Sequence, residues 1–148
     1  MLPNGSLPEA ERPGYQAPGP AAIVRSSPGT SVLYGSAEAV GNKYAYGYCT
    51  YYAYNRRAEL GRPIGSFWGN AATWAAYARG AGFRVDGSPE VGAVMQNSGG
   101  WGGFGHVAVV ESINSDGSVV ISEMNGPAGW NVIGRRTITN PGDFMYIH

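Results

Sequence analysis

The sequence has one cysteine, few charges and no long apolar run, and each shortage excludes a class of protein. Because Cys49 is alone, no intrachain disulfide can form, so the chain is not a disulfide scaffold. Ten Lys and Arg residues balance ten Asp and Glu residues without a basic patch, so nucleic acid is not an expected partner. No apolar run approaches the roughly 20 residues that a membrane-spanning helix needs, so we expect no membrane span.

The composition favours one glycine-rich extracellular domain. The 148 residues suit a single domain, and a hydrophobic content of 43% is enough for a packed core. With 24 glycines and only 14% charged residues, a loop-rich and strand-rich domain is favoured over a helical bundle. Residues 1–41 are rich in Pro, Gly, Ser and Ala, which predicts a linker or arm before a compact domain at 42–148. The first residues lack the basic and apolar regions of a signal peptide, so we expect the natural protein to begin further upstream.

Periodicity predicts two helices followed by several strands. The spacing of small and apolar residues predicts a helix over 49–60 and a second over 70–79, with Asn70 as its N-cap. Arg56 and Arg57 are expected on a solvated helix face. The strands are expected at 92–96, 106–113, 118–125, 132–138 and 144–147. Helices followed by strands, without alternation, indicate an α+β fold.

The hairpin predicted around the loop Asn-Ser-Asp-Gly brings polar residues together. If the residues flanking that loop pair, His106 lies opposite Asn125 and Ala108 lies opposite Glu123, so His106, Glu123 and Asn125 share one sheet face. A β-bulge would change this register. A histidine beside a carboxylate and an amide is the base and orienting half of a catalytic triad.

Cys49 is the candidate nucleophile because it stands at the predicted start of the first helix. Unpaired N–H groups and the helix dipole favour a thiolate there, and the backbone N–H of Cys49 is a candidate oxyanion donor. A lone cysteine is by itself more often a small buried apolar residue. The catalytic interpretation therefore depends on its conjunction with His106, whereas His148 is expected to be frayed or to cap the last strand, without a role.

Several segments resemble one family in the same order along the chain. The stretches GYCTYYAYNRR, WGNAATWAAYARGAGFRV and GHVAVVESINSDGSVVISEMN resemble the CHAP family, the cysteine, histidine-dependent amidohydrolases/peptidases, over about residues 42–148. The resemblance implies a papain-like fold, with N-terminal helices packed on an antiparallel sheet of about five to six strands. It implies that Cys49 is the nucleophile and His106 the general base. Glu123 is then expected to orient the imidazole, and Asn125 to support the site.

The resemblance also implies an activity: hydrolysis of a peptidoglycan amide bond through a thioester. Amidase and endopeptidase remain open, as do a catalytically weak wall-binding or secreted surface module and a transglutaminase-like acyl transferase. We expect a secreted or cell-wall-associated monomer whose partner is peptidoglycan, with no cofactor. Some family members bind calcium through acidic residues upstream of the cysteine, where this chain offers only Glu38, so no metal site is expected.

Three aromatic residues are candidates for substrate binding. Tyr48 stands where the family often has Gln, directly before the nucleophile, so the second oxyanion donor is left open. Trp101 lies in a glycine-rich loop just before His106 and is expected to border the cleft. Trp68 could line the same groove, although packing in the core is the favoured interpretation for it.

Overall fold

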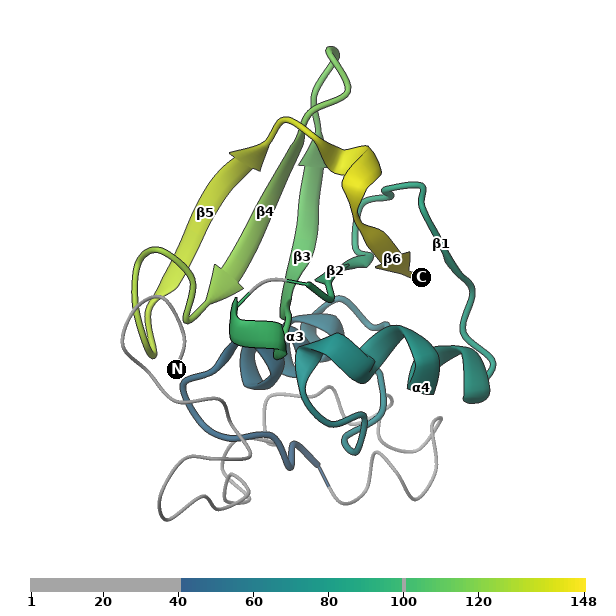
Figure 1. Ribbon diagram of the computed structural model, residues 1–148, viewed down its shortest axis with the longest axis vertical. Helices are drawn as coiled ribbons and strands as arrows, with labels where there is room; N and C mark the ends of the chain where they lie inside the picture. The colour runs from purple at the N-terminus through teal and green to yellow at the C-terminus, as the bar shows by residue number, and fades with distance from the viewer. Residues whose placement is uncertain (1–40, 100) are drawn as a thin grey trace.

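The fold is α+β, with helices gathered on one side of an antiparallel sheet (Figure 1). The computed structural model of the chain describes residues 41–99 and 101–148, with the side chain of Trp101 left out. Within these residues the sheet has six strands in the order β1-β6-β2-β3-β4-β5. The predicted linker or arm at 1–41 lies outside the described residues except for its last one.

The helices agree with the periodicity, with one correction. Helix α3 spans Cys49–Glu59, and the 3-10 turn η3 (Ala71–Thr73) leads directly into α4 (Trp74–Gly80). Asn70 stands at the predicted N-cap position, directly before η3. Its side chain makes no capping hydrogen bond, so the prediction is right in position and wrong in the expected hydrogen bond. The backbone N–H of Thr73 donates to the Asn70 carbonyl at 3.0 Å, which closes the 3-10 turn.

The strands occur where alternation predicted them, with one addition. They are β1 (Val85–Asp86), β2 (Val94–Asn97), β3 (His106–Ile113), β4 (Val119–Met124), β5 (Ile133–Ile138) and β6 (Met145–Ile147). Short 3-10 turns, η4 (Trp101–Gly103) and η5 (Pro141–Asp143), precede β3 and β6. Strand β1 was not predicted, because two residues carry no period. It forms by pairing with β6, which also pairs with β2.

The pairing of β3 with β4 differs from the predicted one near the turn and agrees with it further along the strands. Ile113 pairs with Val119, one residue beyond the expected partner. A bulge at Glu111 then absorbs one residue, so that Val109 pairs with Ser122. The two deviations cancel, so Val110 and Val109 have the partners that the simple hairpin predicted, Ile121 and Ser122. Asn125 lies just beyond β4, so its pairing with His106 stays a prediction.

Two buried apolar clusters lie on the alternating faces of β3. Val107 and Val109 belong to the cluster that contains Cys49 and Trp74 from the two helices. Ala108 and Val110 belong to a second cluster with residues such as Met95, Ile121 and Tyr146. Helix α3 packs on β3 and β4, while α4 packs near β6 and β1. The first turn of α3 is thereby held against the strands that carry His106 and Glu123.

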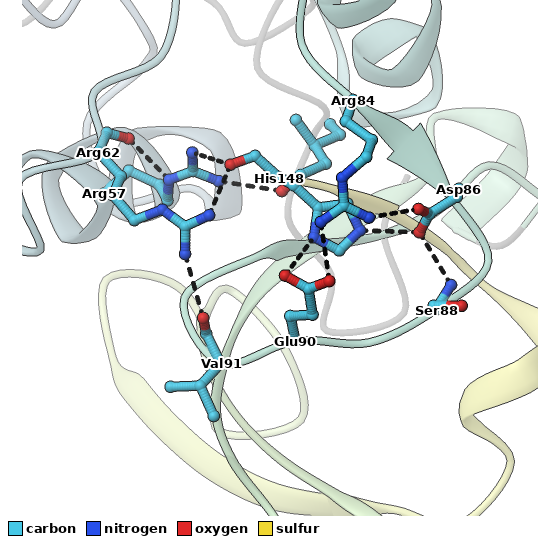
Figure 2. A network of polar contacts seen from close by, with 9 residues as sticks. Arg57, Arg62, Arg84, Asp86, Ser88, Glu90, Val91 and His148 are labelled. Atoms are coloured by element: carbon cyan, nitrogen blue, oxygen red, sulfur yellow. Dashed lines mark hydrogen bonds and ion pairs between the residues drawn. The ribbon is translucent and has the colours of Figure 1, made fainter.

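The expectation that Arg56 and Arg57 are solvated is wrong for Arg57, whereas the side chain of Arg56 is 25% exposed. Arg57 is only 1% exposed, and its guanidinium donates to the backbone carbonyls of Arg62, Ile147 and His148 at 2.7–3.0 Å (Figure 2). Burial, with the charge of Arg62 nearby, lowers the pKa of Arg57 to about 10, so the group remains charged at neutral pH. A helical period cannot reveal this, because two of the three carbonyls, those of Ile147 and His148, come from the far end of the chain.

His148 is held in the same network, so of its two expected states, frayed or capping the last strand, the first is wrong and the second agrees with its contacts (Figure 2). Its side chain is 4% exposed, and its Nε2 lies 2.7 Å from Oδ1 of Asp86. Its backbone N–H donates to the carbonyl of Arg84 at 2.9 Å. Strand β6 is therefore fastened at its end by side chains from α3 and from the segment after α4.

Replacing Arg57 with Ala should lower the free energy of unfolding by about 2–4 kcal/mol, because buried carbonyls lose their donor. Urea denaturation measures this. The matched control is Arg79→Ala, since Arg79 is an exposed arginine in the last turn of α4. An equally small loss in both variants would contradict the anchoring role of Arg57.

Candidate active site

Cys49 is the first residue of α3, as the sequence predicted. The N-cap residue Tyr48 is extended and makes no side-chain capping bond, and the first turn contains no acidic residue. The positive end of the helix dipole therefore acts at Cys49 without a compensating carboxylate in that turn, which favours a thiolate. Cys49 is 6% exposed and shares its buried cluster with Val107, the residue that follows His106.

His106 and Glu123 form a buried pair across β3 and β4. Nε2 of His106 lies 2.8 Å from Oε1 of Glu123, and the two residues are 3% and 2% exposed. A carboxylate can only accept a hydrogen bond, so Nε2 carries the proton in this pair. In the neutral imidazole Nδ1 is then the nitrogen that can accept a proton, which makes it the basic atom.

Arg136, which the sequence analysis did not identify, holds the other side of the Glu123 carboxylate. Its Nε donates to Oε2 at 2.7 Å, and its Nη2 donates to Oε1 at 3.2 Å. Burial would raise the pKa of Glu123, but the hydrogen bonds from His106 and Arg136 outweigh it and leave that pKa below its ordinary value. Glu123 is therefore ionised at neutral pH. Eight residues separate β4 from β5, so the spacing along the sequence does not show that Arg136 and Glu123 are partners.

The chain turns sharply over the Glu123 carboxylate as it leaves β4. Asn125 is 1% exposed and adopts a left-handed backbone with φ of 57°. At Gly126, an added Cβ would lie only 2.7 Å from Cδ of Glu123. The structure thus brings Asn125 to the same strand end as Glu123, and the backbone after it closes tightly on the carboxylate.

The loop between β4 and β5 also contacts the turn that precedes Cys49. The N–H of Asn131 donates to the carbonyl of Gly47 at 2.9 Å. The indole of Trp130 covers Gly47 so closely that a Cβ there would lie 2.4 Å from the ring. Gly47 also has φ of 90°, so this position favours glycine both for its backbone conformation and for the lack of space for a Cβ. The loop therefore connects the strand end at Asn125 with the start of α3.

A polar network fastens α3 to the same two strands. The Tyr52 hydroxyl donates to Oγ of Ser122 at 2.8 Å, and Ser122 donates to Oε2 of Glu111 at 2.6 Å. Arg56 donates to both carboxylate oxygens of Glu111 at 2.9 Å, holding that pKa below its ordinary value. Because Tyr52 lies one turn after Cys49, this network restricts movement of the start of α3 along the sheet.

The candidate substrate-binding residues have different surroundings. Trp68 is 6% exposed and packs edge-on against Trp74 and Phe83, in agreement with the packing interpretation. Tyr48 is 3% exposed and meets the ring of Trp130 edge-on. The side chain of Trp101 lies outside the described part of the structure. Trp130, which was not predicted, is 37% exposed.

Neither a metal site nor a membrane-spanning helix is found in the described part of the chain. Residues 41–99 and 101–148 contain no group of three or more His, Cys, Asp or Glu side chains that could hold a metal ion. None of the helices there is long and apolar enough to cross a membrane. Glu38 lies outside the described residues, so the expectations of no calcium and no cofactor remain predictions.

Comparisons with known proteins agree on one family. The CHAP domain family model matches residues 39–125. The chain is 59% identical over 108 residues to "Probable autolysin LDP" of Staphylococcus aureus, covering 73% of this chain and 38% of the relative. It is 46% identical over 125 residues to the staphylococcal secretory antigen SsaA of the same species, covering 83% of this chain and 47% of the relative.

A solved structure supports the fold. An N-acetylmuramoyl-L-alanine amidase from Staphylococcus aureus superposes with a TM-score of 0.67 at 38% identity, covering 71% of this chain and 31% of that one. The α+β, papain-like prediction is thereby confirmed. The chain spans less than half the length of each of these three relatives.

Replacing Gly126 with Ala should force the Glu123 carboxylate to move, because that group is held by two partners and has no room to yield. We expect the free energy of unfolding to fall by about 1–3 kcal/mol, the usual cost of overpacking, as measured in urea. Gly142→Ala is the matched control, since a Cβ there meets nothing within 4 Å. Equal stability of the two variants would show that the turn does not press on Glu123.

Proposed function

The chain belongs to the CHAP domain family, and from this premise we propose that it hydrolyses an amide bond of bacterial peptidoglycan with Cys49 as nucleophile. The observation that carries the proposal is the buried His106–Glu123 pair at 2.8 Å. It lies on strands against which the helix that starts at Cys49 is packed. Acyl transfer needs a nucleophile, a base and an orienting carboxylate, and these contacts support Cys49, His106 and Glu123 for the three roles.

In the proposed first step, Nδ1 of His106 removes the proton from Sγ of Cys49, and the thiolate attacks the amide carbon. The backbone N–H of Cys49 faces the developing oxyanion at the helix start. The carbon–nitrogen bond then breaks, the imidazolium gives its proton to the leaving amine, and a thioester remains. Water, with His106 again as base, attacks that thioester and releases the acid and the thiol.

Glu123 and Asn125 support the base in this proposal. Glu123 accepts the hydrogen bond from Nε2, which selects the tautomer with a basic Nδ1 and stabilises the imidazolium that forms. Because its pKa is below the ordinary value, Glu123 remains an acceptor throughout the neutral range. Asn125, with its left-handed backbone, directly follows β4 and is two residues from Glu123.

The names of the relatives support peptidoglycan as the substrate and the cell wall as the location. They include an autolysin, a secretory antigen and an N-acetylmuramoyl-L-alanine amidase. We therefore propose a secreted or wall-associated protein, with the bond between N-acetylmuramic acid and L-alanine as the first candidate and stem or cross-bridge peptide bonds as the second.

A surface module without strong activity is the second candidate function. It is favoured by the 46% identity to a protein named only as a secretory antigen. Such a module would bind purified cell walls in a pull-down assay without clearing their turbidity. A hydrolase does both, so the two assays together separate these candidates.

Replacing Cys49 with Ser should reduce the clearing of cell-wall suspensions by at least about 1,000-fold while leaving the melting temperature unchanged, because only the nucleophile is lost. His106→Asn should have a similar effect on activity. His148→Asn is its matched control, since His148 is bonded to Asp86 in the network away from the site. Undiminished clearing by the Cys49 variant would defeat the proposal.

Mass spectrometry of digested muropeptides identifies the bond. An amidase creates a new amino group on L-alanine and frees the lactyl carboxylate of muramic acid. An endopeptidase leaves that bond intact and creates a new amino group within the stem or cross-bridge. We expect the first pattern, and new amines on stem or bridge residues alone would replace it with the second.

A further inference from the structure

We infer that Arg136 is a positioning residue that fixes the Glu123 carboxylate against His106, so that the reactivity of the Cys49–His106 pair depends on it. The inference deepens the proposed function and rests on it for the roles of Cys49 and His106. Arg136 acts through Glu123 and is not placed in contact with substrate.

The geometry of the contact supports a positioning role. A carboxylate bound at one oxygen can rotate about its last carbon–carbon bond, and its hydrogen bond to the imidazole then varies. Arg136 donates to both oxygens, at 2.7 Å to Oε2 and 3.2 Å to Oε1, and so fixes the carboxylate plane. With that plane fixed, Oε1 remains directed at Nε2 of His106 at 2.8 Å.

The burial of the partners shows why such a clamp is needed. Glu123 is 2% exposed, and a buried carboxylate is costly unless its charge and lone pairs are satisfied. The side chain of Arg136 is 40% exposed and comes from β5, most of whose residues are exposed. It can therefore keep part of its guanidinium hydrated while it compensates the buried charge.

The charges around Glu123 determine the direction of the effect. In the described part of the chain, Glu123 is bonded by the imidazole of His106 from β3 and by the guanidinium of Arg136 from β5. Cys49 on α3 is the thiol on which this pair is proposed to act. The guanidinium partly neutralises the carboxylate and so limits how strongly Glu123 favours the imidazolium. Without Arg136, each deprotonation of the Cys–His pair becomes less favourable.

The first experiment compares Arg136→Gln with the unchanged chain in assays of peptidoglycan hydrolysis across pH. We expect kcat to fall about tenfold with little change in KM, because orientation of the base is lost while substrate contacts remain. We also expect the acidic limb of the profile to move up by about half a pH unit, the effect of a nearby, partly screened charge. A purely structural role would lower the melting temperature without moving that limb.

Two further variants separate charge from geometry. Arg136→Lys retains the positive charge but not the two-point contact, so the acidic limb should return to its original position while kcat recovers only in part. Arg135→Gln is the matched control, because Arg135 is the adjacent arginine on β5, 62% exposed and 3.9 Å from Glu111 instead. The Arg135→Gln change also removes one positive charge, and it should leave both kcat and the acidic limb of the pH profile unchanged.

The second experiment measures the rate of Cys49 alkylation by iodoacetamide across pH, which requires no peptidoglycan. The profile of Arg136→Gln should move to higher pH relative to Arg135→Gln. If the unchanged chain fails to cleave peptidoglycan but this shift occurs, the proposed function is wrong and the coupling through Arg136 stands. Coincident profiles for Arg136→Gln and the unchanged chain overturn the inference. If Arg136→Gln does not fold, the Arg136→Lys variant is used for the test. An unaltered kcat in Arg136→Lys then overturns the inference that Arg136 positions Glu123.

Discussion

The buried carboxylate of Glu123 is the constraint on which the geometry of the site depends. At 2% exposure the carboxylate requires donors, and it finds them in His106 from one neighbouring strand and Arg136 from the other. Both contacts exist only if β3, β4 and β5 keep their register, so an error of one residue in either pairing would bury an uncompensated charge. The strand register brings the donors that the buried carboxylate needs, and the cost of leaving that carboxylate without donors favours this register.

Cys49 is held to the same strands by contacts on both sides of the start of its helix. The network of Tyr52, Ser122 and Glu111 fastens α3 to β3 and β4. On the other side, the loop after β4 reaches the turn before Cys49 through the hydrogen bond from Asn131 to Gly47. Closely packed interiors yield little, so these contacts are expected to limit movement of Cys49 relative to β3 and β4, as the proposed acyl transfer requires.

The candidate site could be predicted in part from local patterns. A cysteine at a helix start and a histidine at a strand start follow from periods of 3.6 and 2 residues, which the backbone imposes. The partnership of His106 and Glu123 followed from hairpin pairing, and it held because the bulge at Glu111 offset a one-residue shift at the turn. The predicted pairing agreed with the structure only because the shift at the turn and the bulge offset each other, and no local sequence pattern could reveal either one.

The sequence by itself determined the α+β order of elements, the helix that starts at Cys49 and the strands of His106 and Glu123, because these depend on neighbours in the chain. Only the tertiary structure decided the partners of the arginines. Arg57 is buried against carbonyls about 90 residues away, and Arg136 reaches Glu123 across a loop of eight residues. A charged side chain is solvated or buried according to which distant groups satisfy it, and those groups are assembled only by folding.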